Sequence, residues 1–356
     1  MKVCIVDIQK PREGSGSGIG EYTYHLAKGL KDKKDVEVSE FYAVPKVGRF
    51  DIKNLFYINT LFKAKLASLA KEDFDIIHIT NHEIGFAARI LKQKGTKAKV
   101  ITTIHDAIRM QKDYPHGIMQ RSYNALVKSS IRDACESSDM ILFDSTNTKS
   151  DISKAFKYKS GIVVPLGIRE KLLAKPRKKV RKAIFSVGYI GSFGSNKNVI
   201  SILKVAKLFD NKNNIKFEIY GSGPEYKNLI MFKNKNNIQN VEFKGFAPEN
   251  KLIDIYDSFD VFFFPSMHEG FGLPIIEAQA RGLPTIIFKN VRIPKETRKE
   301  CIEIKDENEA KSMILRLKNK EYSRGKMESA LKYARGFTWE KVLQRVYNIY
   351  NDILGK

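Results

Sequence analysis

The chain has 356 residues, which is long enough for two domains that each bury a core of their own. A hydrophobic content of 42% and a charged content of 29% are those of a soluble globular protein, and no apolar run approaches the length that spans a bilayer. The net charge of +23 favours anionic partners, but it does not distinguish nucleic acid from anionic lipid head groups or nucleotide sugars.

Short apolar strands alternate with helical stretches along almost the whole chain, which predicts parallel α/β sheets. In the first half, the predicted strands are 3–7, 36–42, 76–79, 99–104, 140–144 and 161–164. The helical patterns between them include 20–30, 57–71 and 118–137. The opening residues read as the first strand and not as a secretory signal.

A second series of strands is predicted at 183–187, 215–220, 241–244, 260–264 and 285–288. The basic, proline-containing segment 171–182 separates the two series and is predicted to be an interdomain linker. A helix over 339–354 ends the chain. The cysteines are Cys4, Cys135 and Cys301, which lie far apart and form no metal-ligand spacing, so a reduced cytoplasmic protein is the simplest interpretation.

The helical segment 54–71 carries an apolar stripe beside several lysines. The stripe consists of Leu55, Ile58, Phe62, Leu66 and Leu69, and the lysines are Lys53, Lys63, Lys65 and Lys71. A basic amphipathic helix of this kind can lie on an anionic membrane. Packing of the stripe onto the sheet is the preferred interpretation.

The segment from Glu269 to Glu277 follows an apolar strand and opens a helix, with the sequence Glu-Gly-Phe-Gly-Leu-Pro-Ile-Ile-Glu. Its glycines let backbone N–H groups approach an anion closely, and the helix start adds its positive end. The carboxylates suit neutral hydroxyls, which can donate hydrogen bonds to them. The segment therefore predicts a site for a phosphate-bearing sugar ligand, against the alternative of a solvated first helical turn.

Two candidates follow strands of the first half. His105 comes directly after the strand 99–104, where ligands of open α/β sheets lie, and Asp106 could orient it or cap the next turn. A glycine loop over 14–20 lacks the spacing of a dinucleotide fingerprint and the Lys-Ser/Thr ending of a P-loop. Its glycines, Gly18 and Gly20 among them, suit either a loop whose amides face a ligand or a plain surface loop.

Two candidates lie in the second half. Lys197 closes the loop 188–198 at a helix start, where a cation can neutralise charge on a diphosphate leaving group, although a plain surface lysine is the alternative. Gly221 and Gly223 lie in the segment 219–225, which is either a turn beside a nucleotide or a strand end closed by a Gly/Pro turn.

Together these segments resemble the retaining glycosyltransferases of family 4, whose Glu-x7-Glu signature is matched by Glu269 and Glu277. The resemblance covers nearly the whole chain and implies the α/β GT-B fold, in which two Rossmann-like domains with parallel sheets face each other across a cleft. It implies an acceptor domain over 1–170, with the helix 339–356 packing back on it, and a nucleotide-sugar domain over 183–338.

The resemblance also implies roles for single residues. Glu277 would bind the ribose diol, Glu269 a sugar hydroxyl, and Lys197 the diphosphate, while His105 would meet the sugar from the other domain. The remaining donor-binding residues would be Gly18, Gly20, Gly221, Gly223, Phe246, Phe271, Gly272 and Leu273. The family usually offers an arginine near the diphosphate, and its two places hold Tyr189 and Asn196 here. Arg281 and Arg292 are candidate substitutes.

The implied reaction is the transfer of a hexose from a UDP- or GDP-linked sugar to a hydroxyl of a glycan or lipid-linked acceptor. It would retain the anomeric configuration and need no cofactor and no metal, since Lys197 and the helix start supply the neutralising charge. The departing phosphate oxygen itself would help to deprotonate the acceptor, so no protein nucleophile is required. The one Asp-x-Asp spacing, at 73–75, reads as the polar lead-in of a strand. The implied location is the cytoplasm, with peripheral contact to the inner face of an anionic membrane.

Two other classes of protein remain open from the sequence. One is a different GT-B enzyme, such as a sugar-nucleotide epimerase or a phosphorylase. The other is a basic nucleic-acid-binding protein, which the charge alone suggests. Because no reading helix or aromatic-and-basic strand motif is recognisable, no nucleic-acid partner is expected.

Overall fold

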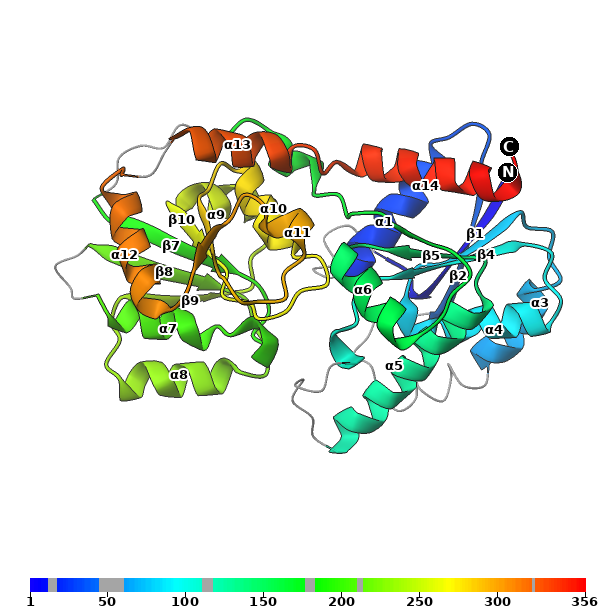
Figure 1. Ribbon diagram of the computed structural model, residues 1–356, viewed down its shortest axis with the longest axis horizontal. Coiled ribbons are helices and arrows are strands. Elements are labelled where there is room, and N and C mark those ends of the chain that lie inside the picture. Colours follow the sequence, from blue (N-terminus) through cyan, green and yellow to red (C-terminus); the bar gives the residue numbers. More distant parts are fainter. Residues whose placement is uncertain (12–17, 45–60, 111–117, 177–182, 210–213, 322–323) are drawn as a thin grey trace. The chain divides into compact units, whose positions relative to one another are not determined.

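The computed structural model describes residues 1–11, 18–44, 61–110, 118–176, 183–209, 214–321 and 324–356 (Figure 1). The chain forms two compact units. The first comprises Met1–Gly167 and Trp339–Lys356, and the second comprises Ile168–Thr338. The chain therefore crosses between the units twice, and residues 168–170 belong to the second unit and not to the first predicted domain.

The first unit is built on a parallel six-stranded sheet with the order β2-β1-β3-β4-β5-β6. Its strands are β1 (Lys2–Gln9), β2 (Glu37–Val44), β3 (Ile76–Ile79), β4 (Lys99–Ile104), β5 (Met140–Phe143) and β6 (Gly161–Val163). Its α-helices are α1 (Gly18–Lys31), α3 (Lys63–Leu69), α4 (Phe86–Gln93), α5 (Ile118–Ser137), α6 (Thr146–Ala155) and α14 (Trp339–Leu354), with short 3-10 helices η2 (His82–Ile84) and η3 (Ile108–Met110).

The second unit repeats this architecture with the strand order β12-β11-β10-β7-β8-β9. Its strands are β7 (Phe185–Ile190), β8 (Ile215–Tyr220), β9 (Val241–Gly245), β10 (Val261–Phe263), β11 (Thr285–Phe288) and β12 (Ile302–Ile304). Its helices are α7 (Ile200–Lys207), α8 (Tyr226–Lys235), α9 (Leu252–Ser258), α10 (Leu273–Ala280), α11 (Lys295–Arg298), α12 (Glu307–Lys318) and α13 (Arg324–Ala334), with η4 (Glu170–Leu173), η5 (Ser195–Lys197) and η7 (Glu249–Lys251).

In each sheet, strands are added along the chain first toward one edge and then toward the other. The order of the strands therefore reverses once, between β1 and β3 in the first unit and between β7 and β10 in the second. Parallel strands bury both faces, so their polar chemistry concentrates where the strands end. Ligands of open α/β sheets bind outside the carboxyl ends of the strands at such a reversal. The two reversals therefore mark the places at which candidate site residues are expected to gather.

Helix α14 returns the end of the chain to the first unit, where it packs against α1 (Figure 1). Val346, Ile349 and Tyr350 are buried. The Tyr350 hydroxyl also lies 2.6 Å from Nδ1 of His78 on β3, so the last helix is hydrogen-bonded to the centre of the sheet.

The apolar stripe around α3 packs into the first unit. Phe62, Leu66 and Leu69 are all buried in the core that contains β3 and α4. This confirms the packing interpretation for these three residues, while Leu55 and Ile58 lie outside the described residues. Within the part of the chain that the structure describes, every helix is too short or too polar to cross a bilayer.

A matched pair of substitutions tests the packing of α3. Leu66→Ala should lower the free energy of unfolding by about 2–5 kcal/mol, because the side chain is fully buried and its removal leaves a cavity. Leu61→Ala should change it by less than about 0.5 kcal/mol, because Leu61 is 51% exposed. Urea unfolding measures both, and equal effects of the two substitutions would refute the assignment.

Candidate active site

Lys197 and Glu269 meet at the reversal of the second sheet. Lys197 ends η5 after β7, and Glu269 follows β10. The Lys197 Nζ atom lies 2.6 Å from Oε1 and 2.8 Å from Oε2 of Glu269, and the two side chains are only 18% and 8% exposed. The structure thus brings two predicted catalytic residues into one nearly dry ion pair, where the attraction is stronger than in water.

The two loops that carry this pair are hydrogen-bonded to each other through Asn196. Its carbonyl accepts from the N–H of Met267 at 2.8 Å, and its side-chain amide donates to the carbonyl of His268 at 3.3 Å. Tyr189, at the other place where the family offers an arginine, is buried and donates its hydroxyl to the carbonyl of Ser192. Both residues therefore have structural roles in this chain.

Gly272 makes the turn that opens α10. Its φ of 94° lies in the left-handed region, which a side chain would strain. Among the described residues, no acceptor is hydrogen-bonded to the N–H of Gly272 or Leu273, and no side chain caps the helix. Two N–H groups at the positive end of α10 thus have no hydrogen-bond acceptor in the described part of the chain, and the predicted binding of an anion there stays a prediction.

Glu277 lies one helical turn further along α10 and is only 4% exposed. Its Oε1 accepts from Nη1 of Arg169 at 2.6 Å, and its Oε2 accepts from the hydroxyl of Tyr256 at 2.8 Å. Burial and the neighbouring Glu277 carboxylate raise the pKa of Tyr256 well above its usual range, so the phenol stays a donor. Each carboxylate oxygen retains a lone pair for a ligand hydroxyl.

Gly221 and Gly223 have a structural reason for being glycine. Gly221 has a φ of 145°, and a β-carbon on it would lie 1.8 Å from the carbonyl oxygen of Gly191. A β-carbon on Gly223 would lie 2.6 Å from the backbone nitrogen of Phe193. The two loops pack backbone against backbone, so the glycines by themselves are no evidence of a nucleotide.

The other predicted donor-binding residues are placed differently. Phe246 follows β9 and is 66% exposed, so its ring is open to a planar ligand. Phe271 is buried instead and packs against Phe337. Gly18 and Gly20 lie in the first turn of α1, and the preceding part of their loop is outside the described residues.

Arg281 cannot substitute for the missing arginine. Its side chain is 1% exposed, forms an ion pair with Asp257 at 2.7 Å, and donates to the carbonyls of Leu172 and Ala174. Arg292 is exposed, and its backbone is hydrogen-bonded to Met267 and Glu269 on the loop that follows β10. Its role as a substitute stays a prediction.

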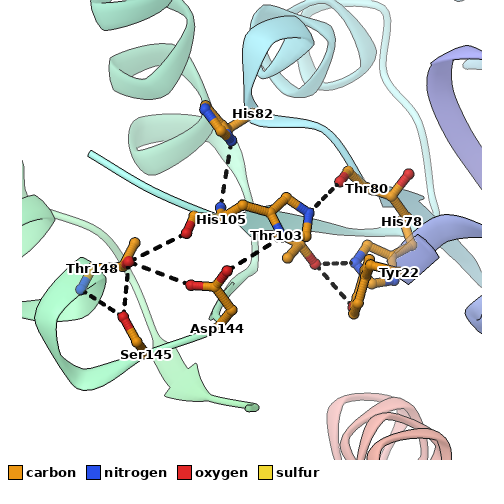
Figure 2. Close-up of polar contacts among 9 residues, drawn as sticks. All are labelled: Tyr22, His78, Thr80, His82, Thr103, His105, Asp144, Ser145 and Thr148. Atoms are coloured by element: carbon orange, nitrogen blue, oxygen red, sulfur yellow. Dashed lines mark hydrogen bonds and ion pairs between the residues drawn. The ribbon is translucent and has the colours of Figure 1, made fainter. Parts of the chain in front are cut away.

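The first unit holds His105 at the end of β4 (Figure 2). Its Nε2 lies 2.9 Å from the carbonyl oxygen of Thr80, and its Nδ1 lies 3.5 Å from Oδ2 of Asp144. Asp106 instead accepts from the N–H of Ile108 at 3.1 Å, so it caps the following turn and does not orient the ring. No local sequence pattern pointed to Asp144 as the partner of His105.

Burial and charge set the proton affinities of this pair. Burial would lower the pKa of His105, but the Asp144 carboxylate outweighs it and the pKa is raised. Burial raises the pKa of Asp144 to about 6, against the opposing effect of His105.

No group of three or more His, Cys, Asp or Glu side chains that could hold a metal ion occurs among the described residues. Asp73 and Asp75 of the Asp-x-Asp spacing accept from the side chain and the backbone N–H of Lys2, respectively. Both carboxylates therefore fix the start of β1, in agreement with the interpretation of this spacing as a polar lead-in.

Arg281→Met tests the structural role of Arg281. The substitution leaves the Asp257 carboxylate without its counter-ion, so it should cost about 3–5 kcal/mol in the free energy of unfolding. The double variant Arg281→Met/Asp257→Leu should lose less, because it removes the unpaired charge. Titration of the folded variants with UDP should give the affinity of the parent protein. A weaker affinity would show that Arg281 contributes to binding of the diphosphate.

Comparison with known proteins assigns both halves of the chain. Residues 16–171 match the model of Glycosyltransferase Family 4, and residues 169–335 match that of Glycosyl transferases group 1. An uncharacterised glycosyltransferase of Methanocaldococcus jannaschii is 24% identical over 99% of both chains. The O-antigen chain mannosyltransferase B of Escherichia coli is 22% identical over 94% of this chain and 96% of its own.

Solved structures agree in fold. Sucrose-phosphate synthase from Thermosynechococcus elongatus superposes with a TM-score of 0.80 at 16% identity and 99% coverage of both chains. HepE from Anabaena, solved with UDP and glucose, gives a TM-score of 0.76 at 14% identity, over 99% of this chain and 100% of its own. These likenesses confirm the predicted GT-B fold, and with both family models matched, the chain belongs to the family 4 glycosyltransferases.

Proposed function

We propose that this transferase moves a hexose from a UDP- or GDP-linked sugar to a hydroxyl of a glycan or lipid-linked acceptor, with retention of configuration and without a metal. One observation carries the proposal. The Lys197–Glu269 ion pair and the buried Glu277 carboxylate flank the uncapped start of α10 at the reversal of the second sheet. Anion donors and hydroxyl acceptors are thus gathered in one place.

The donor class follows from the groups present. The N–H groups of Gly272 and Leu273 suit phosphate oxygens, and the orientation of Glu277 suits the two hydroxyls of a ribose. The Anabaena protein HepE, which shares the fold, has been solved with UDP-glucose. That complex and the mannosyltransferase among the relatives support a nucleotide-sugar donor without choosing between uridine and guanosine.

Lys197 would change partners during the reaction. Without a donor, its charge is balanced by Glu269. A bound diphosphate would compete for the ammonium group and free the carboxylate for a sugar hydroxyl. Lys197 and the start of α10 would then stabilise the charge that develops on the leaving phosphate, which is the part a metal plays in other transferases. Following the family resemblance, His105 is the residue of the first unit that would contact the sugar.

The acceptor and the location are proposed from the family resemblance and the charge. Lys63, Lys65 and Lys71 are exposed beside α3, in a chain with a net charge of +23. A basic surface of this kind attracts anionic head groups, where a lipid-linked acceptor would be found. We therefore place the protein at the cytoplasmic face of the membrane as a peripheral enzyme.

Lys197→Ala tests the diphosphate contact. A hydrogen bond between an ammonium group and a phosphate contributes about 1.5–3 kcal/mol, so the affinity for the preferred nucleoside diphosphate should fall about 10–100-fold in calorimetric titration. Lys204→Ala is the control, because Lys204 lies on α7 and is 51% exposed. Equal affinities of the parent protein and the Lys197 variant would remove Lys197 from the donor site.

Chelation tests metal independence. Transfer of the sugar should continue at an unchanged rate after exhaustive treatment with EDTA, because a lysine and backbone amides carry the neutralising charge. Products are followed by mass spectrometry with the donor that binds most tightly. Loss of activity that Mg²⁺ or Mn²⁺ restores would contradict the mechanism, and a free epimer or a sugar phosphate as product would contradict transfer itself.

A further inference from the structure

His105 lies in a network of buried polar groups at the carboxyl ends of β3, β4 and β5 (Figure 2). Its side chain is 5% exposed, and that of Asp144 is 3% exposed. The ring packs edge-on against Tyr22, with 5.1 Å between the ring centroids. Both ring nitrogens face protein groups, so the position and the proton content of the ring are set within the first unit.

The geometry fixes where the protons of His105 must be. The carbonyl of Thr80 can only accept, so Nε2 carries a hydrogen and donates it. In a neutral ring, Nδ1 would then present its lone pair to the Asp144 carboxylate at 3.5 Å. That repulsion disappears when the pair holds one more proton, either on Nδ1 or on the carboxyl group.

Two local contacts of Asp144 favour its ionised form, against the effect of its burial. Its Oδ1 accepts from the Thr148 hydroxyl at 3.3 Å. Asp144 directly precedes Ser145, whose hydroxyl caps the start of α6 by accepting from the N–H of Thr148 at 3.1 Å. A carboxylate next to a helix start is stabilised by the positive end of the helix. The extra proton is therefore held by Nδ1, as an imidazolium facing a carboxylate.

Within the part of the chain that the structure describes, Asp144 is the direct ionic partner of His105. On β3, burial lowers the pKa of His78 to about 3, so this neighbour is neutral. On η2, the Nδ1 of His82 accepts from the backbone N–H of His105 at 3.4 Å. Two further carboxylates act from a greater distance: Asp106 next in sequence, and Asp7 on β1, whose pKa is raised by burial.

We propose that Asp144 is a positioning residue of the transfer reaction, which keeps His105 doubly protonated so that the ring acts as a fixed cation and never as a base. The proposal rests on the proposed function only in assigning His105 to the donor sugar. An imidazolium carries a hydrogen on both ring nitrogens, so it cannot take the proton of an acceptor hydroxyl. That proton must leave with the departing phosphate, and His105 contributes charge and shape.

The charge of the ring can be read without any substrate. Full-length protein labelled with ¹⁵N in the histidine rings is titrated by NMR, and His105→Gln identifies the signal. In the parent protein this ring should stay an imidazolium through neutral pH and lose its proton above the usual range of histidine. In Asp144→Asn, the ring should be neutral at pH 7, since the carboxylate that retains the proton is gone.

Asp106→Asn is the matched control, because it removes an adjacent carboxylate that caps a turn and keeps an oxygen for the N–H of Ile108. It should leave the ring an imidazolium at pH 7. A neutral ring in the parent protein, or equal effects of the two Asp→Asn substitutions, would overturn the proposal.

Kinetics then connect the charge to the reaction. With the nucleotide sugar that the parent enzyme turns over, Asp144→Asn should lower kcat by about 10–100-fold, as second-sphere partners commonly do. It should also move the alkaline limb of the pH profile to lower pH, because the cation is lost as pH rises through the pKa of His105. An unchanged profile would refute the positioning role. Absence of turnover in the parent enzyme would refute the proposed function, while the NMR titration still decides the state of the ring.

Discussion

A carboxylate that is removed from water must be paired with a cation or hydrogen-bonded, and this constraint organises the functional part of the molecule. Glu269 faces Lys197, Glu277 faces Arg169, and Asp144 faces His105, all at distances of an ion pair. Removal of one partner from such a pair costs far more than the pair contributes. These pairs therefore hold their side chains in fixed positions at the strand ends.

The fold decides where these pairs occur. Both sheets are parallel and buried on their faces, so polar side chains concentrate at the strand ends, and each strand order reverses once. In the second unit, Lys197 and Glu269 come from the loops after β7 and β10, the two strands at the reversal. In the first unit, His105 and Asp144 follow the adjacent strands β4 and β5. The same construction places the uncapped start of α10 in one unit and the buried His105–Asp144 pair in the other.

Local patterns made much of this predictable from the sequence. The strands β3, β4, β8 and β11 have the predicted bounds, because each is an apolar run closed by turn residues. β12 was missed because three residues around an exposed Glu303 carry too little periodicity. The Glu269–Glu277 turn was recognisable, since its glycines and its helix start are contiguous. Arg169 was not, because it lies 108 residues from the glutamate that it binds, and only the folded sheet brings the two together. Asp144 was missed for the same reason. Arg281 is no longer a candidate because it is buried, and no local sequence pattern reports burial.

Hydrogen exchange with and without a nucleotide shows whether α10 holds the donor. If it does, one of UDP, GDP or ADP, or its sugar conjugate, slows exchange most strongly in the segment around Gly272 and Leu273, whose N–H groups have no acceptor among the described residues. Peptides from the second half of α12, which runs away from the carboxyl end of β12, should not change. Unchanged exchange around Gly272 with every nucleotide, or protection confined to another part of the second unit, would contradict the placement of the donor on α10.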